Sequence, residues 1–235
     1  MKYRYLIVLF VVTIFSCKKT VRKNIVETEN KNESSKELVD YECTYDNKVN
    51  SLGKGLVILP TSFEIYKDSL LLDKQFDLDM YADEVELCSK YHKPDYGIMQ
   101  LVCLEETDKS YKVIVNHVDI KYVPKTEEYI FVRWNDYIMN SFGIRRKDKN
   151  QPIYIEANKN SEKLDLPTGL ESLCPLEVKN DWVKVRWDCF YNDQDGVNEE
   201  RQSCHDYTKK CGDSMTGWLK WRTDSEINIG IFITT

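Results

Sequence analysis

The stretch Asp181-Trp182-Val183-Lys184-Val185-Arg186 carries the clearest fold signal in this chain of 235 residues. From Val183 onward its positions alternate between apolar and charged, and β-branched valines fill the apolar ones, which is typical of a strand with one buried face. The same alternation recurs in short segments separated by clusters of Asn, Asp and Lys, which favour turns. These segments are Gly55–Leu59, Ile98–Leu104, Tyr111–Val115, Tyr129–Trp134 and Gly230–Thr234. We therefore predict an all-β fold, with Tyr81–His92 as a candidate helix.

The segments around this stretch occur in pairs. Glu177–Arg186 resembles Glu106–Val115, because each has a polar turn, an aromatic residue and then an alternating strand. The remaining pairs are Phe63–Asp68 with Pro152–Ala157, Asp119–Tyr122 with Gly217–Trp221, and Tyr129–Phe131 with Ile227–Phe232. An internal repeat of this kind predicts two units of similar size, which we place at residues 41–140 and 141–235.

Residues 151–225 resemble a bacterial Src-homology-3-like (SH3-like) domain. The resemblance rests on Asp181–Arg186 and on Thr216-Gly217-Trp218-Leu219, which match two strands of the family pattern, while Gly143-Ile144-Arg145 matches its early Arg-containing strand. Residues 188–215, which contain several cysteines, depart from the family because they form a long insertion where a short turn is usual. The resemblance implies two small β-barrels in tandem that bind peptides or peptidoglycan in the cell envelope.

The N-terminus predicts export. Lys2 and Arg4 precede the apolar run Leu6–Phe15, which is shorter than the about 20 residues that a transmembrane helix needs, so residues 1–16 are typical of a signal peptide. Ile14-Phe15-Ser16-Cys17 also resembles the bacterial lipobox, with Phe15 as its departure from the usual small or β-branched residue. That resemblance implies a lipid on Cys17 and a membrane anchor, most simply on the periplasmic side of the envelope.

The composition of residues 17–40 predicts a tether, and the overall charge limits the classes of partner that the protein can bind. Residues 17–40 are rich in charge and poor in apolar residues, so we expect a flexible tether. The net charge of −6 argues against a nucleic-acid partner, which would require a basic stripe. The expected partners are the membrane, through the lipid, and a peptide, peptidoglycan or protein.

An exported chain keeps its disulfides, and seven of the eight cysteines remain if Cys17 is lipidated. Spacing alone favours three pairs, Cys204–Cys211, Cys88–Cys103 and Cys174–Cys189, with Cys43 unpaired. Zinc binding by Cys189, Cys204, His205 and Cys211 is the weaker reading, because a short Cys-x-x-Cys clip is lacking. A weak calcium site at Asp188, Asp193 and Asp195 is a further alternative, and we predict neither a metal nor another cofactor.

Aromatic residues at the ends of strands are candidates for a ligand groove or for the core. We assign Trp187, Trp221 and Tyr122 to a groove, and Trp182 and Trp218 to the core.

The sequence offers little support for catalysis. No His-Glu-x-x-His, Gly-x-Ser-x-Gly or phosphate-binding glycine motif occurs, and a pair such as Cys103 with His117 has no motif behind it. The acidic run Asp77, Asp79, Asp83, Glu84 and Glu86 is typical of a solvated face. The expected function is non-catalytic binding. The alternatives are an immunity or inhibitor lipoprotein that acts through residues 188–215, and an envelope hydrolase.

Overall fold

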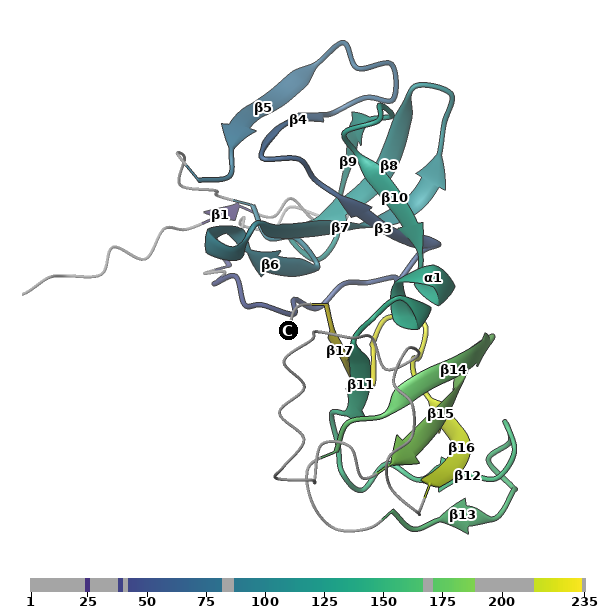
Figure 1. The fold of residues 1–235 in the computed structure, drawn as a ribbon. Helices are drawn as coiled ribbons and strands as arrows, with labels where there is room; N and C mark the ends of the chain where they lie inside the picture. Colours follow the sequence, from purple (N-terminus) through teal and green to yellow (C-terminus); the bar gives the residue numbers. More distant parts are fainter. Residues whose placement is uncertain are drawn as a thin grey trace, which may run out of the picture. The chain divides into compact units, whose positions relative to one another are not determined.

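The computed structural model describes residues 42–81, 87–166, 171–188 and 214–233, and the backbone of two short strands nearer the N-terminus (Figure 1). Those strands, β1 (Asn24–Ile25) and β2 (Leu38–Val39), pair antiparallel within the segment that was expected to be a tether. The contacts of the chain divide it into Met1–Glu42 and Cys43–Thr235.

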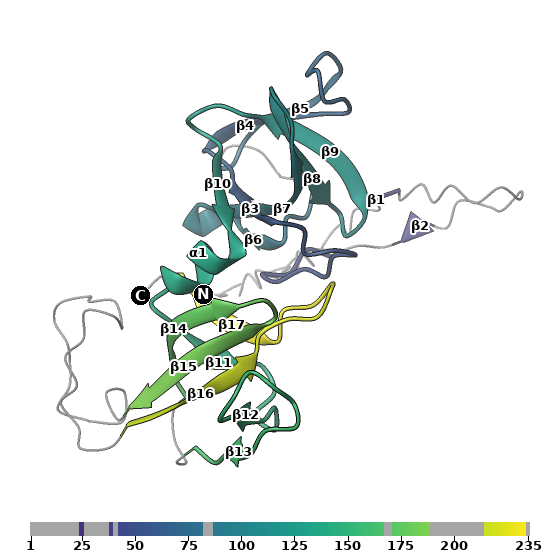
Figure 2. The same cartoon turned by 90° about the vertical axis from the view of Figure 1, so that its right-hand side faces the viewer.

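The predominantly β character predicted from the sequence is confirmed, and the first sheet accounts for most of it. Its strand order is β10-β3-β7-β8-β9-β4-β5, with β6 paired to β7, and the curved sheet is best followed in Figure 2. The strands are β3 (Gly55–Ile58), β4 (Ser62–Tyr66), β5 (Lys74–Asp79), β6 (Tyr91–Lys93), β7 (Ile98–Glu106), β8 (Ser110–Val115), β9 (Asp119–Pro124) and β10 (Ile130–Arg133). A single 3-10 turn, Pro94–Tyr96, joins β6 to β7. The expected helix at Tyr81–His92 is wrong over its described residues 87–92, which contain no helix and lead into β6.

The second half begins with the short helix α1 (Trp134–Met139), after which the strand pattern starts again. A five-stranded sheet has the order β13-β12-β16-β15-β14, and β11 pairs separately with β17. The strands are β11 (Gly143–Arg146), β12 (Ile153–Tyr154), β13 (Lys163–Leu164), β14 (Cys174–Lys179), β15 (Trp182–Asp188), β16 (Ser214–Lys220) and β17 (Ile229–Phe232).

The two halves share one strand order. The path β7-β8-β9-β4-β5 of the first half corresponds to β14-β15-β16-β12-β13 of the second, and β10 pairs with β3 as β17 pairs with β11. Even the register shift recurs, between Cys103 and Glu105 in β7 and between Pro175 and Glu177 in β14. All four segment pairs expected from the sequence fall on corresponding strands. Among the described residues, the hydrogen-bonded order of neither sheet closes on itself.

One hydrophobic core joins the two halves. It includes Leu56 and Val102 of the first sheet together with Val183 and Leu219 of the second, whereas a second core lies within the first half alone. Trp134 of α1 contacts both halves. Its Nε1 donates to the carbonyl oxygen of Leu52 (2.6 Å) in the first half, and its ring packs against Trp221 of the second half, with ring centroids 6.0 Å apart. The boundary expected at residue 140 therefore marks where the repeat restarts, and the core runs across it.

Within the described part of the chain, no helix has the length and apolar character needed to cross a membrane.

Candidate functional site

A cavity of about 680 Å³ lies where residues of both halves meet, and we call it the junction pocket. Its lining comes from segments far apart in the sequence: Asp46–Lys48, Lys90, several residues between Lys147 and Lys159, Trp182 with Lys220, and Ser225–Asn228. The volume lies within the range of about 300–1,000 Å³ that is usual for small-ligand sites.

Lys90 is the most enclosed charge in the junction pocket, with a side chain only 4% exposed. Its Nζ donates to Asp46 Oδ1 at 2.5 Å and to the Asn47 carbonyl oxygen at 2.9 Å. The other oxygen of the Asp46 carboxylate accepts from Lys147, so one carboxylate lies between two ammonium groups. Burial lowers the pKa of Lys90 from its ordinary value, and the charge of Asp46 opposes that shift.

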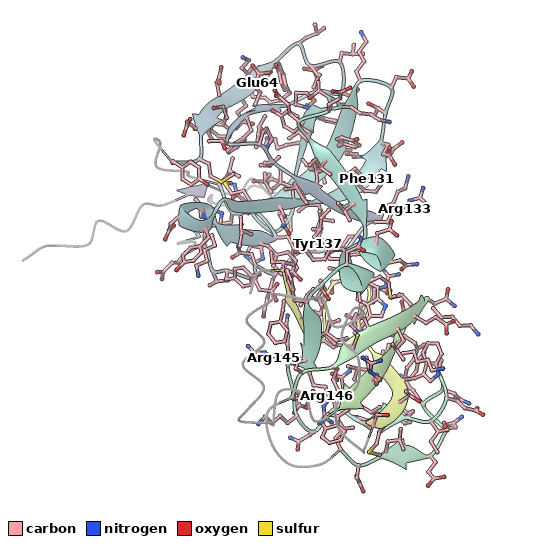
Figure 3. All side chains as sticks on the ribbon, viewed as in Figure 1. Glu64, Phe131, Arg133, Tyr137, Arg145 and Arg146 are labelled. Atoms are coloured by element: carbon pink, nitrogen blue, oxygen red, sulfur yellow. A yellow bond between two sulfur atoms is a disulfide. The ribbon has the colours of Figure 1, made fainter. Side chains whose placement is uncertain are left out.

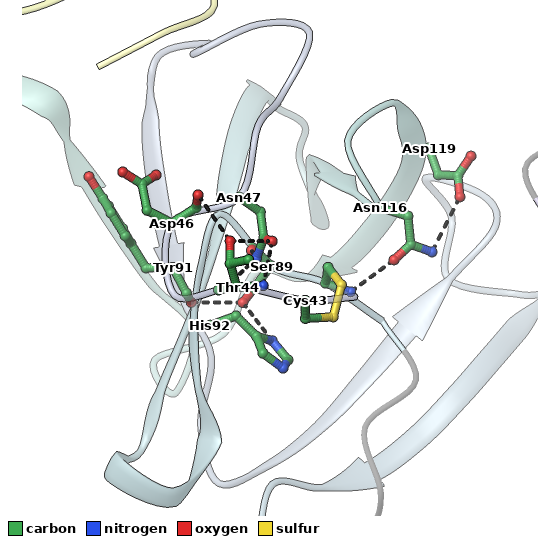
Figure 4. The surroundings of a disulfide bond; sticks show 10 residues. Cys43, Thr44, Asp46, Asn47, Ser89, Tyr91, His92, Asn116 and Asp119 are labelled. Atoms are coloured by element: carbon green, nitrogen blue, oxygen red, sulfur yellow. Dashed lines mark hydrogen bonds between the residues drawn. A yellow bond between two sulfur atoms is a disulfide. The ribbon is translucent and has the colours of Figure 1, made fainter. Parts of the chain in front are cut away.

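The segment Cys43–Asn50, which we call the strap, brings Asp46 to the pocket and is fixed by a disulfide between Cys43 and Cys88 (Figure 4). The Asn47 side chain donates to the carbonyl oxygens of Thr44 and Ser89, each at 2.7 Å. These bonds hold Asp46 on a covalently attached and hydrogen-bonded segment, so its position is largely preorganised.

Arg146, which follows Arg145 in β11, fixes Gln151 in the lining of the junction pocket (Figure 3). Its guanidinium forms a two-pronged ion pair with Glu171, with Nε–Oε1 at 3.0 Å and Nη2–Oε2 at 2.8 Å. Its Nη1 donates to the Gln151 carbonyl oxygen at 2.6 Å, and the Gln151 amide donates to the Lys220 carbonyl oxygen at 2.5 Å. Arg146 is thus a positioning residue for the loop between β11 and β12.

Aromatic and cationic side chains interleave on the outward face of the second sheet. Trp182 and Lys220 are direct cross-strand partners, and Trp218 lies opposite both Lys184 and Tyr154. The rings of Tyr154 and Trp182 meet edge to face, with centroids 5.6 Å apart at 81°. All five side chains are half-buried, and Tyr154, Trp182 and Lys220 line the junction pocket.

The sequence-based assignment of the tryptophans is wrong in both directions. Trp187 and Trp221, expected in a groove, are 6% and 1% exposed and belong to the core. Trp182 and Trp218, expected in the core, lie on the outward face. The alternation explains this, because Trp187 shares the inward face of β15 with Val183 and Val185.

The third groove candidate, Tyr122, lies elsewhere in the fold. It is half-buried on β9, opposite Tyr66 and Lys112, and it does not line the junction pocket.

The cysteines pair differently from the expectation. Cys88 is disulfide-bonded, but to Cys43 rather than to Cys103, which is a free buried thiol. Spacing considers only separation along the chain, whereas the fold brings Cys43 of the strap to within 5.3 Å of Cys88, Cα to Cα, across 45 residues of sequence. Cys174 is disulfide-bonded, and Cys189, the partner predicted for it, lies outside the described residues. The expectations for Cys17, Cys189, Cys204 and Cys211 fall outside the described residues.

Only part of the set of residues considered for catalysis lies within the described residues. Burial raises the pKa of the Cys103 thiol to about 12, so the thiolate is scarce at neutral pH. Asp77 is exposed and pairs with Lys74, whereas Asp83, Glu84 and Glu86 are outside the described residues.

Most of the metal candidates also lie outside the described residues. His205, Asp193 and Asp195 fall outside the described residues, and for Asp188 the structure describes only the backbone. Within the described ranges, no three His, Cys, Asp or Glu side chains are grouped so as to hold a metal ion.

The charge of the junction pocket opposes that of the chain. Five lysines and three acidic residues line it, a balance of 5 − 3 = +2, whereas the whole chain carries −6. The lysines are Lys48, Lys90, Lys147, Lys159 and Lys220, and the acids are Asp46, Asp148 and Glu226. A cationic cavity with an aromatic wall suits a ligand that is both anionic and partly apolar. Comparison of the chain with protein-family models, with curated proteins and with solved structures gave no match.

Proposed function

We propose that this chain is a lipid-anchored protein of the bacterial cell envelope that acts as a non-catalytic binding module for a peptide, cell-wall or protein partner. The observation that carries the proposal is the junction pocket, a cavity of about 680 Å³ with a positive balance of charge and the Tyr154–Trp182 pair in its wall. Residues of both halves line the pocket, so we expect the ligand to contact both repeats.

We assign the two halves to the SH3-like class as fused repeats. Support comes from their common strand order and from the positions of the motif residues. Asp181–Arg186 spans the turn into β15, Gly217 and Trp218 lie in β16, and Gly143–Arg145 begins β11.

The anchor is tested by acyl labelling of the wild type and of Cys17→Ala in a bacterial host. The proposal expects lipid label and membrane association in the wild type and neither in the variant. Equal labelling of both proteins would contradict lipidation at Cys17.

The binding role is tested with the full chain in detergent, presented to purified peptidoglycan and to solubilised envelope extract. Trp182→Ala removes the aromatic wall of the junction pocket, and Tyr96→Ala, which changes a 66% exposed aromatic residue outside that pocket, is the matched control. The proposal expects retention that Trp182→Ala abolishes and Tyr96→Ala preserves. No retention of the wild type, or retention that Trp182→Ala leaves unchanged, would refute it.

A further inference from the structure

We infer that the junction pocket recognises the free carboxylate end of a peptide whose last side chain is apolar. The inference rests on the proposed function and deepens it by naming the ligand group that the pocket binds.

The first support is that some lysines of the pocket are ion-paired within the protein and others are not. Lys90 and Lys147 are already bound to Asp46. In the described part of the chain, Lys48, Lys159 and Lys220 line the same cavity without an ion pair to another residue. The acids Asp148 and Glu226 also line it, so the surplus is two positive charges, which suits one small anionic group better than a polyanion.

Asp46 supplies a precedent for the chemistry. Its carboxylate accepts from Lys90 and Lys147 together, in a setting where the Lys90 side chain is almost completely shielded from solvent. The pocket therefore already stabilises one carboxylate between ammonium groups, and a ligand carboxylate would meet the same kind of donors at Lys220 and Lys159.

The second support is the position of the apolar wall. The edge-to-face rings of Tyr154 and Trp182 form a corner, to which Pro152 and Ile227 add apolar surface. Lys220 is the direct cross-strand partner of Trp182, and such partners have Cβ atoms about 4.5–5.5 Å apart. A terminal residue carries its carboxylate and its side chain on one Cα, so it can reach the ammonium group and the corner together. An acidic side chain within a peptide lacks that apolar group beside its carboxylate.

The size of the site agrees with a chain end. A cavity of about 680 Å³ is large enough for the last residues of a peptide and falls in the usual range for small ligands.

The experiment uses the full chain in detergent micelles and an N-acetylated tetrapeptide that ends in leucine, with binding followed by calorimetry. Three forms are compared: the free acid, the C-terminal amide, and an amidated peptide with an internal glutamate. We expect the amide to bind at least roughly ten-fold more weakly than the acid, since charged hydrogen bonds are lost. The internal glutamate should not restore binding.

Lys220→Gln should weaken binding of the acid roughly five-fold and leave binding of the amide unchanged. Lys109→Gln, at an exposed lysine in the turn between β7 and β8, is the matched control and should change neither. Equal affinity for acid and amide, recovery by the internal glutamate, or an unaffected Lys220→Gln variant would overturn the inference. In each of these cases the proposed function still stands if Trp182→Ala abolishes retention of the envelope partner, and it fails separately if that retention persists.

Discussion

At the scale of single residues, the Asp46 carboxylate determines the electrostatics of the junction pocket. It neutralises Lys90, which is 4% exposed, while remaining 22% exposed itself, and it also bonds to Lys147. An enclosed ammonium group without a partner is costly, because burial disfavours its charged form. Asp46 therefore stabilises the folded state chiefly by keeping Lys90 paired.

Asp46→Asn should lower the free energy of unfolding by about 2 kcal/mol, between the values for exposed and buried pairs. Lys90→Met in the same chain should recover part of that loss, because the unpaired charge is then gone. Urea denaturation of both single variants and the double variant measures the coupling energy. Additive effects of the two substitutions would show that the pair contributes nothing.

The same pair predicts a pH dependence. Burial lowers the pKa of Lys90 in the folded state, so the unfolded state binds more protons and stability rises as pH increases toward the ordinary lysine value. Removing Asp46 removes an influence that raises this pKa, so Lys90 of Asp46→Asn loses its proton at a lower pH. The stability difference between wild type and Asp46→Asn should accordingly shrink between pH 7 and about pH 10. A difference that is constant or grows would contradict the assignment.

The buried thiol of Cys103 gives a second prediction at this scale. Because burial raises its pKa to about 12 and its side chain is shielded in the core, iodoacetamide at pH 7.5 should leave Cys103 unmodified in the native protein. It should react once denaturant is added. Mass spectrometry of the peptide that contains Cys103 measures this directly, and rapid native labelling would show that this strand opens readily.

At the scale of elements, the close packing of β12 against β16 explains why a glycine precedes Trp218. Gly217 lies in β16 close to its antiparallel neighbour β12: a Cβ atom there would be 2.6 Å from Ile153 Cγ2 and 2.9 Å from the Tyr154 carbonyl oxygen. The glycine is needed for this close approach, and its neighbour Trp218 is thereby placed on the outward face beside Tyr154.

Gly217→Ala should therefore destabilise the protein by about 1–3 kcal/mol, the usual cost of overpacking. Gly230→Ala is the control, because a Cβ atom there would contact the flexible Arg145 side chain at 3.2 Å, and we expect a change below about 0.5 kcal/mol. Thermal denaturation of the two variants side by side tests this. Equal effects would show that the approach of β12 is not tight.

The strands themselves were largely predictable, because period-two alternation depends only on local sequence. Gly55–Leu59, Tyr111–Val115 and Trp182–Trp187 all fall on strands. The same alternation would have placed Trp187 and Trp221 inside, had the inward face first been assigned to the valines of β15 and to Leu219 of β16. End-of-strand position proved a poorer guide to exposure than the face on which a residue lies.

At the scale of the whole molecule, the repeats are joined by a common core. Ile114 of the first sheet and Leu219 of the second belong to one buried cluster, and Trp134 contacts Trp221 while bonding to Leu52. Because this cluster takes residues from both halves, separating the halves would expose apolar surface on each, although the first half also contains a core of its own.

We expect one cooperative thermal transition for Cys43–Thr235, with equal calorimetric and van't Hoff enthalpies. Trp134→Ala should lower the whole transition by roughly 10 °C, as a large core truncation does in a unit of this size. Differential scanning calorimetry provides the measurement. Two transitions, of which Trp134→Ala shifts only one, would show that the halves fold independently.

The sequence alone determined the β class, the positions of most strands and the four pairs of repeated segments, because alternation, turn residues and repeat spacing are local properties. Only the tertiary structure decided the Cys43–Cys88 pairing and the junction pocket. The physical reason is separation along the chain: Asp46 and Lys90 are 44 residues apart, and Asp46 and Lys147 are 101 apart. Such contacts arise from how the strap and the two sheets pack together, and no local pattern encodes that packing.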